Sequence, residues 1–170
     1  EDMGSYEGLI ITPRVPLRAD DSIRQTEQVD WLKTATDDAW SNGNRGSGAT
    51  TLLYTTWTHL TAEPTQSHPE DHLSFRERLN LDEPRWEGMQ DFVNDNRPVG
   101  QVPLHMVPGH RLMMRVFDDI ELGTAPFTNI ADIFEDNIHP NATGRYGLTL
   151  LHYACIYGRD PGAYLPDALN

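Results

Sequence analysis

The sequence predicts an α/β domain built around a parallel sheet. Three short runs typical of β-strands alternate with segments whose apolar residues recur at helical spacing, which is the pattern of strands joined by crossover helices. A length of 170 residues suits one domain, so residues 1–170 are expected to form a single unit. Three strands make a narrow sheet and the first begins close to residue 1, so we expect one or more N-terminal strands to be absent from this chain.

The first half of the chain carries two of the predicted strands. Leu9–Thr12 is short and apolar, as in a buried strand, and Pro13 ends it. A residue among 20–22 can cap the helix that follows, and the composition of residues 41–48 is typical of a loop. Thr50–Trp57 is the second strand. The helix between the strands should bury one face, which consists of Val29, Leu32, Thr36, Ala39 and Trp40.

The second half begins with a long polar stretch, His59–Asp82, which we expect to be a loop. Pro84 suits the first turn of a helix, and Val102–Val107 is the third predicted strand. The last helix should run from about Asn141 to Tyr157. Helical spacing predicts three inner faces: Trp86, Met89 and Val93; then Leu112, Met113, Val116, Phe117 and Ile120; and finally Leu148, Leu151, His152 and Cys155.

The chain is strongly acidic, with 26 Asp and Glu against 13 Lys and Arg and a formal charge of −13. A phosphate-binding surface needs clustered Lys and Arg, so this balance argues against a nucleic-acid partner and against an anionic membrane surface. No apolar run approaches the roughly 18 residues of a membrane-spanning helix. Cys155 is the single cysteine, which excludes an internal disulfide and a four-thiolate metal site. The compartment stays open, periplasmic and extracellular locations included.

The strongest candidate for chemistry is the segment Asp136-Asn137-Ile138-His139. A carboxylate that accepts the Nδ1 proton of a histidine leaves Nε2 free to act as a base. The spacing alone is a weak signal, because 16 Asp and 7 His in 170 residues should give about 0.7 such pairs by chance. The alternative is structural, since an aspartate in this loop could cap the helix that follows Pro140.

The surroundings of this segment resemble a known family. Residues 130–161 read IADIFEDNIHPNATGRYGLTLLHYACIYGRDP, which is similar to the C-terminal block of the SGNH (GDSL-type) hydrolase superfamily. In that block Asp-x-x-His-Pro-Asn precedes a Gly and a long apolar helix. Tyr153-Ala154 and residues 157–161 look like a bacterial branch of the superfamily. Weaker similarity covers residues 6–17, 54–57 and 75–79 and the helix around Trp86.

The resemblance implies a flavodoxin-like three-layer α/β/α fold and a serine esterase that needs no cofactor. Its substrate would be a small acyl ester, a carbohydrate acetyl ester included, cleaved through an acyl-enzyme. In that scheme Asp136 orients His139, and His139 takes the proton of a serine hydroxyl and later passes it to the leaving alcohol. The rival hypothesis is a non-catalytic binding or assembly module that keeps the fold.

Parts of the family pattern are missing from this chain. The superfamily's serine follows its first strand in a Gly-Asp-Ser-like block, and neither that block nor the oxyanion-hole Gly and the Gly-x-Asn-Asp block occurs here. We therefore expect an N-terminal portion or a separate fragment to supply the serine, because none of the serines considered has that context: Ser5, Ser22, Ser41, Ser47, Ser67 and Ser74.

Two residues are candidates for substrate binding. Arg14 follows Pro13 at the end of the first predicted strand, and Trp57 ends the second, where ligands collect in open α/β sheets. Trp57 could stack on a sugar ring, or it could be a core residue. Pro13 and Thr55 stand where the bacterial branch usually has acidic residues, which makes the pocket of this chain different.

A second cluster consists of His59, His68 and His72. His68 and His72 are four residues apart, a spacing that would suit Zn²⁺ on a helix, but Pro69 and the polar composition favour a loop. We therefore expect solvated histidines here and no metal ligand.

Overall fold

The computed structural model describes residues 3–13, 22–62 and 70–164. These residues belong to two compact units. The sheet unit consists of Glu1–Trp57 and Asn80–Met106, and the loop unit consists of Thr58–Leu79 and Val107–Asn170. The single domain expected for residues 1–170 stays a prediction.

The strands form one parallel sheet in the order β1-β2-β3, with the bounds Gly8–Ile11, Thr50–Thr55 and His105–Pro108. β1 and β2 pair from Gly8 opposite Thr50 to Ile11 opposite Leu53. A helix separates each strand from the next, which parallel neighbours require because the chain must return to the edge where it began. The predicted α/β class with a parallel sheet is confirmed, in agreement with a flavodoxin-like fold.

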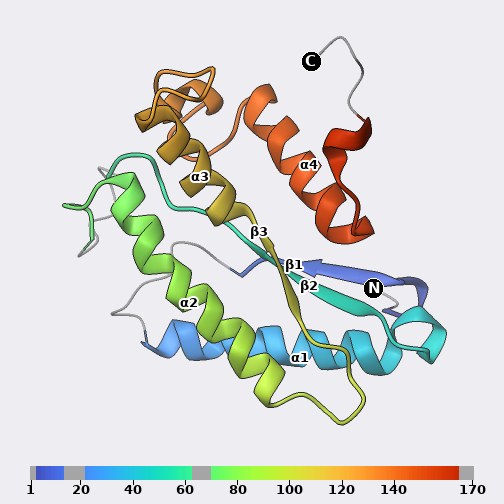
Figure 1. Cartoon of the computed structure of the whole chain (residues 1–170). Coiled ribbons are helices and arrows are strands. Elements are labelled where there is room, and N and C mark those ends of the chain that lie inside the picture. The colour runs from blue at the N-terminus through green and yellow to red at the C-terminus, as the bar shows by residue number, and fades with distance from the viewer. Residues whose placement is uncertain (1–2, 14–21, 63–69, 165–170) are drawn as a thin grey trace. The chain divides into compact units, whose positions relative to one another are not determined.

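Two helices, α1 (Ser22–Gly46) and α2 (Phe75–Asp95), link the strands in chain order (Figure 1). The core of the sheet unit draws on both helices and on β1 and β2, so both helices pack on the same face of these strands. Its buried members are Ile11, Leu32, Leu53, Trp86, Met89, Val93 and Leu104. Ile10, next to buried Ile11, is 43% exposed, so β1 is not buried on both faces as its apolar run predicts.

The end of α1 is a left-handed turn. Gly43 leaves helical geometry with a ψ of 164°, and Asn44 and Arg45 have φ values of 50° and 57°. The Asn44 N–H donates to the carbonyl of Tyr6 at 2.7 Å, which ties this turn to the segment before β1. The predicted loop over residues 41–48 is therefore shorter, since regular helical geometry continues up to Gly43.

α2 begins at Phe75, so the prediction of a helix start at Pro84 is wrong and the polar loop before it is shorter than predicted. Ser74 and Glu77 form a capping box: the Glu77 N–H donates to Ser74 Oγ at 3.3 Å, and the Ser74 N–H donates to Glu77 Oε2 at 2.8 Å. The Ser74 hydroxyl, with that N–H, lowers the pKa of Glu77. Pro84 is tolerated inside the helix because burial of the following turns, including fully buried Trp86, stabilises it.

β3 begins at His105 rather than at Val102 as predicted. Pro103 has no N–H for a strand ladder, and at Leu104 side-chain amides from α2 take the ladder's place. The Leu104 N–H donates to Asn94 Oδ1 at 2.8 Å, and its carbonyl accepts from Gln90 Nε2 at 2.8 Å and from Asn94 Nδ2 at 3.1 Å.

The loop unit contains two further helices, α3 (Gly109–Glu121) and α4 (Ala142–Tyr157), which agree with the helices that the sequence predicts. Among the described residues, short 3₁₀ segments occur at η1 (Met3–Ser5), η2 (Ile130–Ile133) and η3 (Pro161–Tyr164). Phe75 packs its ring against Phe117 and Phe134, with centroids 6.4 Å apart in both pairs.

The predicted inner face of α4 is only partly correct. Leu148 is buried, whereas Leu151, His152 and Cys155 are half-buried. Burial still raises the pKa of the Cys155 thiol. Apolar residues occur on all sides of this helix, so helical spacing does not single out one stripe that must face inward.

Candidate functional site

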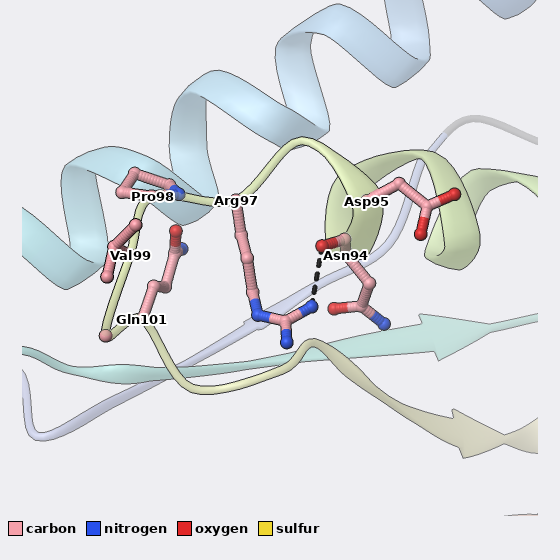
Figure 2. A pocket seen from close by; sticks show the side chains of 7 residues that line it. Asn94, Asp95, Arg97, Pro98, Val99 and Gln101 are labelled. Carbon is pink, nitrogen blue, oxygen red and sulfur yellow. Dashed lines mark hydrogen bonds between the residues drawn. The ribbon is translucent and has the colours of Figure 1, made fainter.

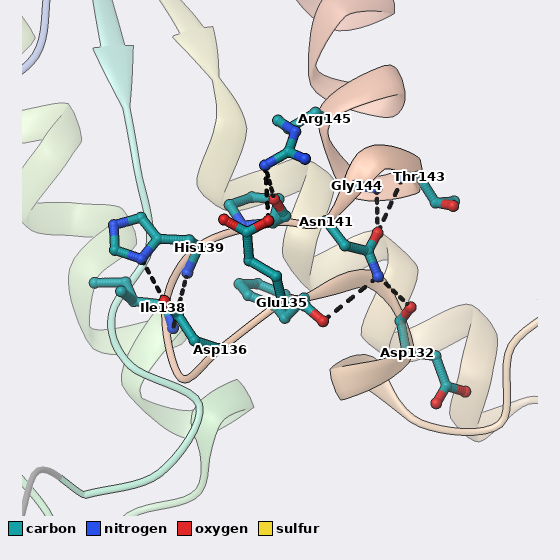
Figure 3. Close-up of polar contacts among 11 residues, drawn as sticks. Asp132, Glu135, Asp136, Ile138, His139, Asn141, Thr143, Gly144 and Arg145 are labelled. Atoms are coloured by element: carbon teal, nitrogen blue, oxygen red, sulfur yellow. Dashed lines mark hydrogen bonds and ion pairs between the residues drawn. The ribbon is translucent and has the colours of Figure 1, made fainter.

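Asp136 and His139 form a hydrogen-bonded pair on the surface of the loop unit. Nδ1 of His139 lies 2.7 Å from Oδ2 of Asp136 (Figure 3). The two side chains are 52% and 68% exposed, and no described residue bonds to Nε2 of His139. An ionised carboxylate can only accept, so Nδ1 carries the proton of the neutral ring and Nε2 keeps a free lone pair. The sequence interpretation of His139 as a base requires this geometry.

Asp136 is held in its ionised form by its own loop. Its second oxygen, Oδ1, accepts the backbone N–H of His139 at 2.7 Å and that of Ile138 at 2.8 Å. These bonds, first the one from the His139 N–H and then the one from Ile138, act together with the His139 ring to lower the pKa of Asp136 to about 2. The carboxylate is therefore available as an acceptor at any pH above about 4.

The loop that carries the pair is closed at its base by backbone bonds. Phe134 and Pro140 form an isolated antiparallel bridge, and the Glu135 N–H donates to the carbonyl of His139 at 2.8 Å. Arg145 reinforces the closure, because its Nη1 donates to the carbonyl of Pro140 at 2.9 Å and to Glu135 Oε2 at 3.0 Å (Figure 3). His139 therefore sits on a short hairpin of defined shape.

Asn141, and not Asp136, caps α4. Its Oδ1 accepts the N–H groups of Thr143 at 3.0 Å and of Gly144 at 3.2 Å, while its Nδ2 donates to the carbonyls of Asp132 at 2.8 Å and Phe134 at 3.4 Å. The alternative interpretation of Asp136 as the cap of this helix is therefore wrong, because Asn141 is the capping residue. The close packing leaves no room for a side chain at Gly144, where a Cβ would lie 2.4 Å from the Ile133 carbonyl oxygen.

The tip of the hairpin is tied to the segment that follows β2. Asn137 Oδ1 accepts from the Thr61 N–H at 2.9 Å and from Thr61 Oγ1 at 3.0 Å, and Asn137 Nδ2 donates to the Thr61 carbonyl at 3.1 Å. The backbone carbonyl of Asn137 accepts the Leu60 N–H at 2.8 Å. Asn137 has no predicted role in the sequence pattern around Asp136 and His139. No sequence signal could have found it, because the contact joins residues 76 positions apart.

The segment after β2 is anchored in turn by a buried arginine. Arg78, only 6% exposed, donates from Nη2 to the carbonyls of His59 at 2.8 Å and Leu60 at 3.1 Å. His59, which the sequence analysis groups with other histidines, thus contributes its backbone to this anchor. His72 is exposed in the turn before α2, and His68 lies outside the described residues.

Of the two candidates for substrate binding, Trp57 and Arg14, the structure describes only Trp57. Trp57 is 6% exposed, and this burial favours the core alternative over stacking on a sugar. Arg14 lies outside the described residues, as does Ser67. Within the described part of the chain no serine hydroxyl bonds to His139. Ser74, in the same unit as His139, is engaged in the capping box of α2.

Hollows among the described residues lie away from the pair. One of about 610 Å³ in the sheet unit is lined by residues 94, 95 and 97–101, and there Arg97 Nη1 donates to the Asn94 carbonyl at 2.6 Å (Figure 2). A smaller one of about 200 Å³ in the loop unit is almost entirely apolar and is lined by Leu112, Met113, Val116, Phe127, Ile133, Thr143, Gly144, Tyr146 and Gly147. Neither is lined by Asp136 or His139.

No family model, no curated protein and no solved structure matches this chain. The resemblance to SGNH hydrolases therefore rests on the residues quoted above. Among residues 3–13, 22–62 and 70–164, no group of three or more His, Cys, Asp or Glu is placed to hold a metal ion. None of the described helices has the length and apolar character needed to cross a bilayer.

Proposed function

We propose that this chain carries the general base of an SGNH-type serine esterase that cleaves small acyl esters, carbohydrate acetyl esters included. The observation that carries the proposal is the 2.7 Å bond between His139 Nδ1 and an Asp136 carboxylate whose pKa is lowered to about 2. This bond fixes the proton on Nδ1 and turns a basic Nε2 toward solvent. The nucleophilic serine is not assigned, because no serine hydroxyl of the described residues bonds to His139.

In the proposed reaction, Nε2 of His139 removes the proton from the serine hydroxyl while the serine Oγ bonds to the ester carbonyl carbon. Asp136 stabilises the imidazolium that results. The tetrahedral intermediate collapses, the bond to the alcohol oxygen breaks, and the Nε2 proton passes to that oxygen. Water then attacks the acyl-serine, and His139 acts as base and acid a second time, which regenerates the serine and releases the acid.

The rival is a binding or assembly module in which the same pair only shapes its loop. The observation in its favour is that no described serine hydroxyl bonds to His139. In that case Asp136 would serve chiefly through its two bonds to backbone N–H groups, as carboxylates in many turns do.

Turnover of p-nitrophenyl acetate by the full-length protein separates the two functions. His139→Ala should lower kcat about 10²–10⁴-fold, the usual contribution of a general base, and added imidazole should restore part of the rate. His105→Ala, which removes an exposed histidine of the sheet unit, is the matched control and should keep the rate. Equal rates for His139→Ala and the unmodified protein contradict the role of His139. If neither the unmodified protein nor His139→Ala hydrolyses the ester, the result supports the binding module instead of the esterase.

A further inference from the structure

We propose that Asn137 is a positioning residue for His139, an inference that rests on the esterase function proposed above. Asn137 lies inside the hairpin that carries the pair, between Asp136 and His139 in sequence. Its side-chain amide bonds to the N–H, the hydroxyl and the carbonyl of Thr61, and its backbone carbonyl accepts the Leu60 N–H. The role of these bonds is to hold the tip of the hairpin, and with it Nε2 of His139, at a constant place in the loop unit.

The hairpin needs such a tie because the bonds of Asp136 and Glu135 described above are internal to it. Asp136 Oδ1 bonds to N–H groups two and three residues ahead, and the bond from Glu135 to His139 closes the hairpin on itself. These contacts define the shape of the turn but not its direction relative to the rest of the unit. At its base the hairpin is held by Asn141, and at its tip Asn137 bonds to Leu60 and Thr61 of the segment after β2.

The chemistry of the contact suits an amide and no other side chain of this size. Thr61 offers a backbone N–H and a hydroxyl to Oδ1 at 2.9 and 3.0 Å, and its carbonyl takes the N–H of Nδ2 at 3.1 Å. An aspartate could accept the first two bonds but would set a negative charge against the Thr61 carbonyl. A leucine could make none of them.

The partner segment is itself fixed, which makes the tie a rigid one. Arg78 lies in the first turns of α2 and is 6% exposed. Its Nη2 donates hydrogen bonds to the carbonyls of His59 and Leu60. A continuous path of hydrogen bonds thus runs from α2 through residues 59–61 to Asn137, two positions before His139. Every member of the path belongs to the loop unit.

Loss of the amide should leave the Asp136–His139 bond intact but let the hairpin tilt. A displacement of about 1 Å at a reacting group can cost about 10²-fold in rate, whereas ground-state binding of a small ester depends little on His139. The expected signature of Asn137→Ala is therefore a fall in kcat of about 10–100-fold with KM within about twofold.

The test measures kcat and KM for p-nitrophenyl acetate in the full-length protein and in Asn137→Ala, Asn137→Asp and Asn129→Ala. Asn129 is the matched control, because its side chain also bonds a backbone N–H of the loop unit, that of Ala131 at 2.9 Å, but has no contact with the hairpin tip. Asn137→Asp should resemble Asn137→Ala, because the carboxylate cannot donate to Thr61.

A second readout does not depend on turnover. Amide hydrogen exchange at Leu60 and Thr61, and ¹⁵N relaxation at Ile138 and His139, should show faster exchange and a looser tip in Asn137→Ala but not in Asn129→Ala. The inference is overturned if kcat falls equally in both variants, or if the tip keeps its order without the amide. If the unmodified protein has no esterase activity, the proposed function fails, and the exchange and relaxation data alone then decide whether Asn137 fixes the hairpin.

Discussion

The sheet unit and the loop unit are stabilised in different ways. In the sheet unit, one apolar cluster contains the fully buried side chains of Leu32, Leu53 and Trp86. Around His139, by contrast, the chain is shaped by carboxylates and amides that bond backbone groups, above all those of Asp136 and Asn141. Apolar burial is non-directional and decides where elements pack, whereas hydrogen bonds decide where single atoms lie. Changes in the first region should therefore reduce stability, and changes in the second should reduce activity.

The largest expected effect is that of Asp136→Asn on ester hydrolysis. An amide at this place would turn N–H toward Nδ1, so the ring proton would move to Nε2 and the base would be lost. We expect kcat to fall about 10²–10⁴-fold, no more than for His139→Ala. Asp132→Asn is the matched control, since Asp132 also accepts backbone N–H bonds, from Thr128 and Asn129, but has no histidine. An equal loss in both variants would show that only the loop's shape matters.

The next effect is on stability and belongs to the sheet unit. Leu53 is fully buried in the central strand, so Leu53→Ala should lower the free energy of unfolding by about 2–5 kcal/mol. Leu151→Ala, on half-buried α4, should cost only about 1 kcal/mol. Urea denaturation measures both values. A larger loss at Leu151 would mean that the two units differ less than their burial indicates.

Ser74→Ala should have a smaller effect. It removes the hydroxyl of the capping box and leaves the Glu77 N–H without its acceptor, which typically costs about 1 kcal/mol. Glu77→Gln keeps a side chain that can accept the Ser74 N–H, so it should be milder. Thermal unfolding followed by circular dichroism compares the two. No loss in Ser74→Ala would indicate that packing alone determines where α2 begins.

The smallest effect is the response to acid. Because the pKa of Asp136 is lowered in the folded protein to about 2, its contribution to stability is fully present above about pH 4 and is lost as the pH falls through 2. Because the Asp136 side chain is 52% exposed, solvent screening keeps its contribution to the free energy of unfolding small. Asp136 stays ionised between pH 5 and 8, and any change of kcat/KM in that range must come from another group. An NMR titration of Asp136 with a midpoint near 4 would contradict the bonding described here.

The fold follows from the sequence wherever apolar periodicity is strong. Leu32, Trp86 and Leu53 are buried where their spacing predicts, and the parallel direction of the strands follows from the alternation of strands and helices. The sequence also contains a signal for the start of α2, because Ser74-x-x-Glu77 is the pattern of a capping box. Pro84 is a competing signal, since proline is common in the first turn of a helix. The start of β3 depends on α2 amides that bond Leu104, and no local pattern shows that.

Less of the candidate site than of the fold can be predicted from the sequence. The Asp136–His139 spacing is compatible with a bonded pair but would occur by chance at about this frequency, so only the geometry shows that the two side chains meet. The bonds from Ile138 and His139 to Asp136 depend on the dihedral angles of the turn, which side-chain types alone do not specify. Asn137 and Arg78 act through backbone groups far away in sequence, and backbone partners leave no pattern in the sequence.

The cap of α4 also bears on modification of the chain. Asn141-Ala142-Thr143 matches the acceptor pattern for N-linked glycosylation, in which a sugar replaces one hydrogen of Nδ2. In the folded chain Nδ2 donates to the carbonyls of Asp132 and Phe134, while Oδ1 caps the helix. A glycan at this asparagine would displace one of those donations and crowd the turn beside His139. Glycosylation of Asn141 would therefore compete with a contact that helps to hold the turn before α4.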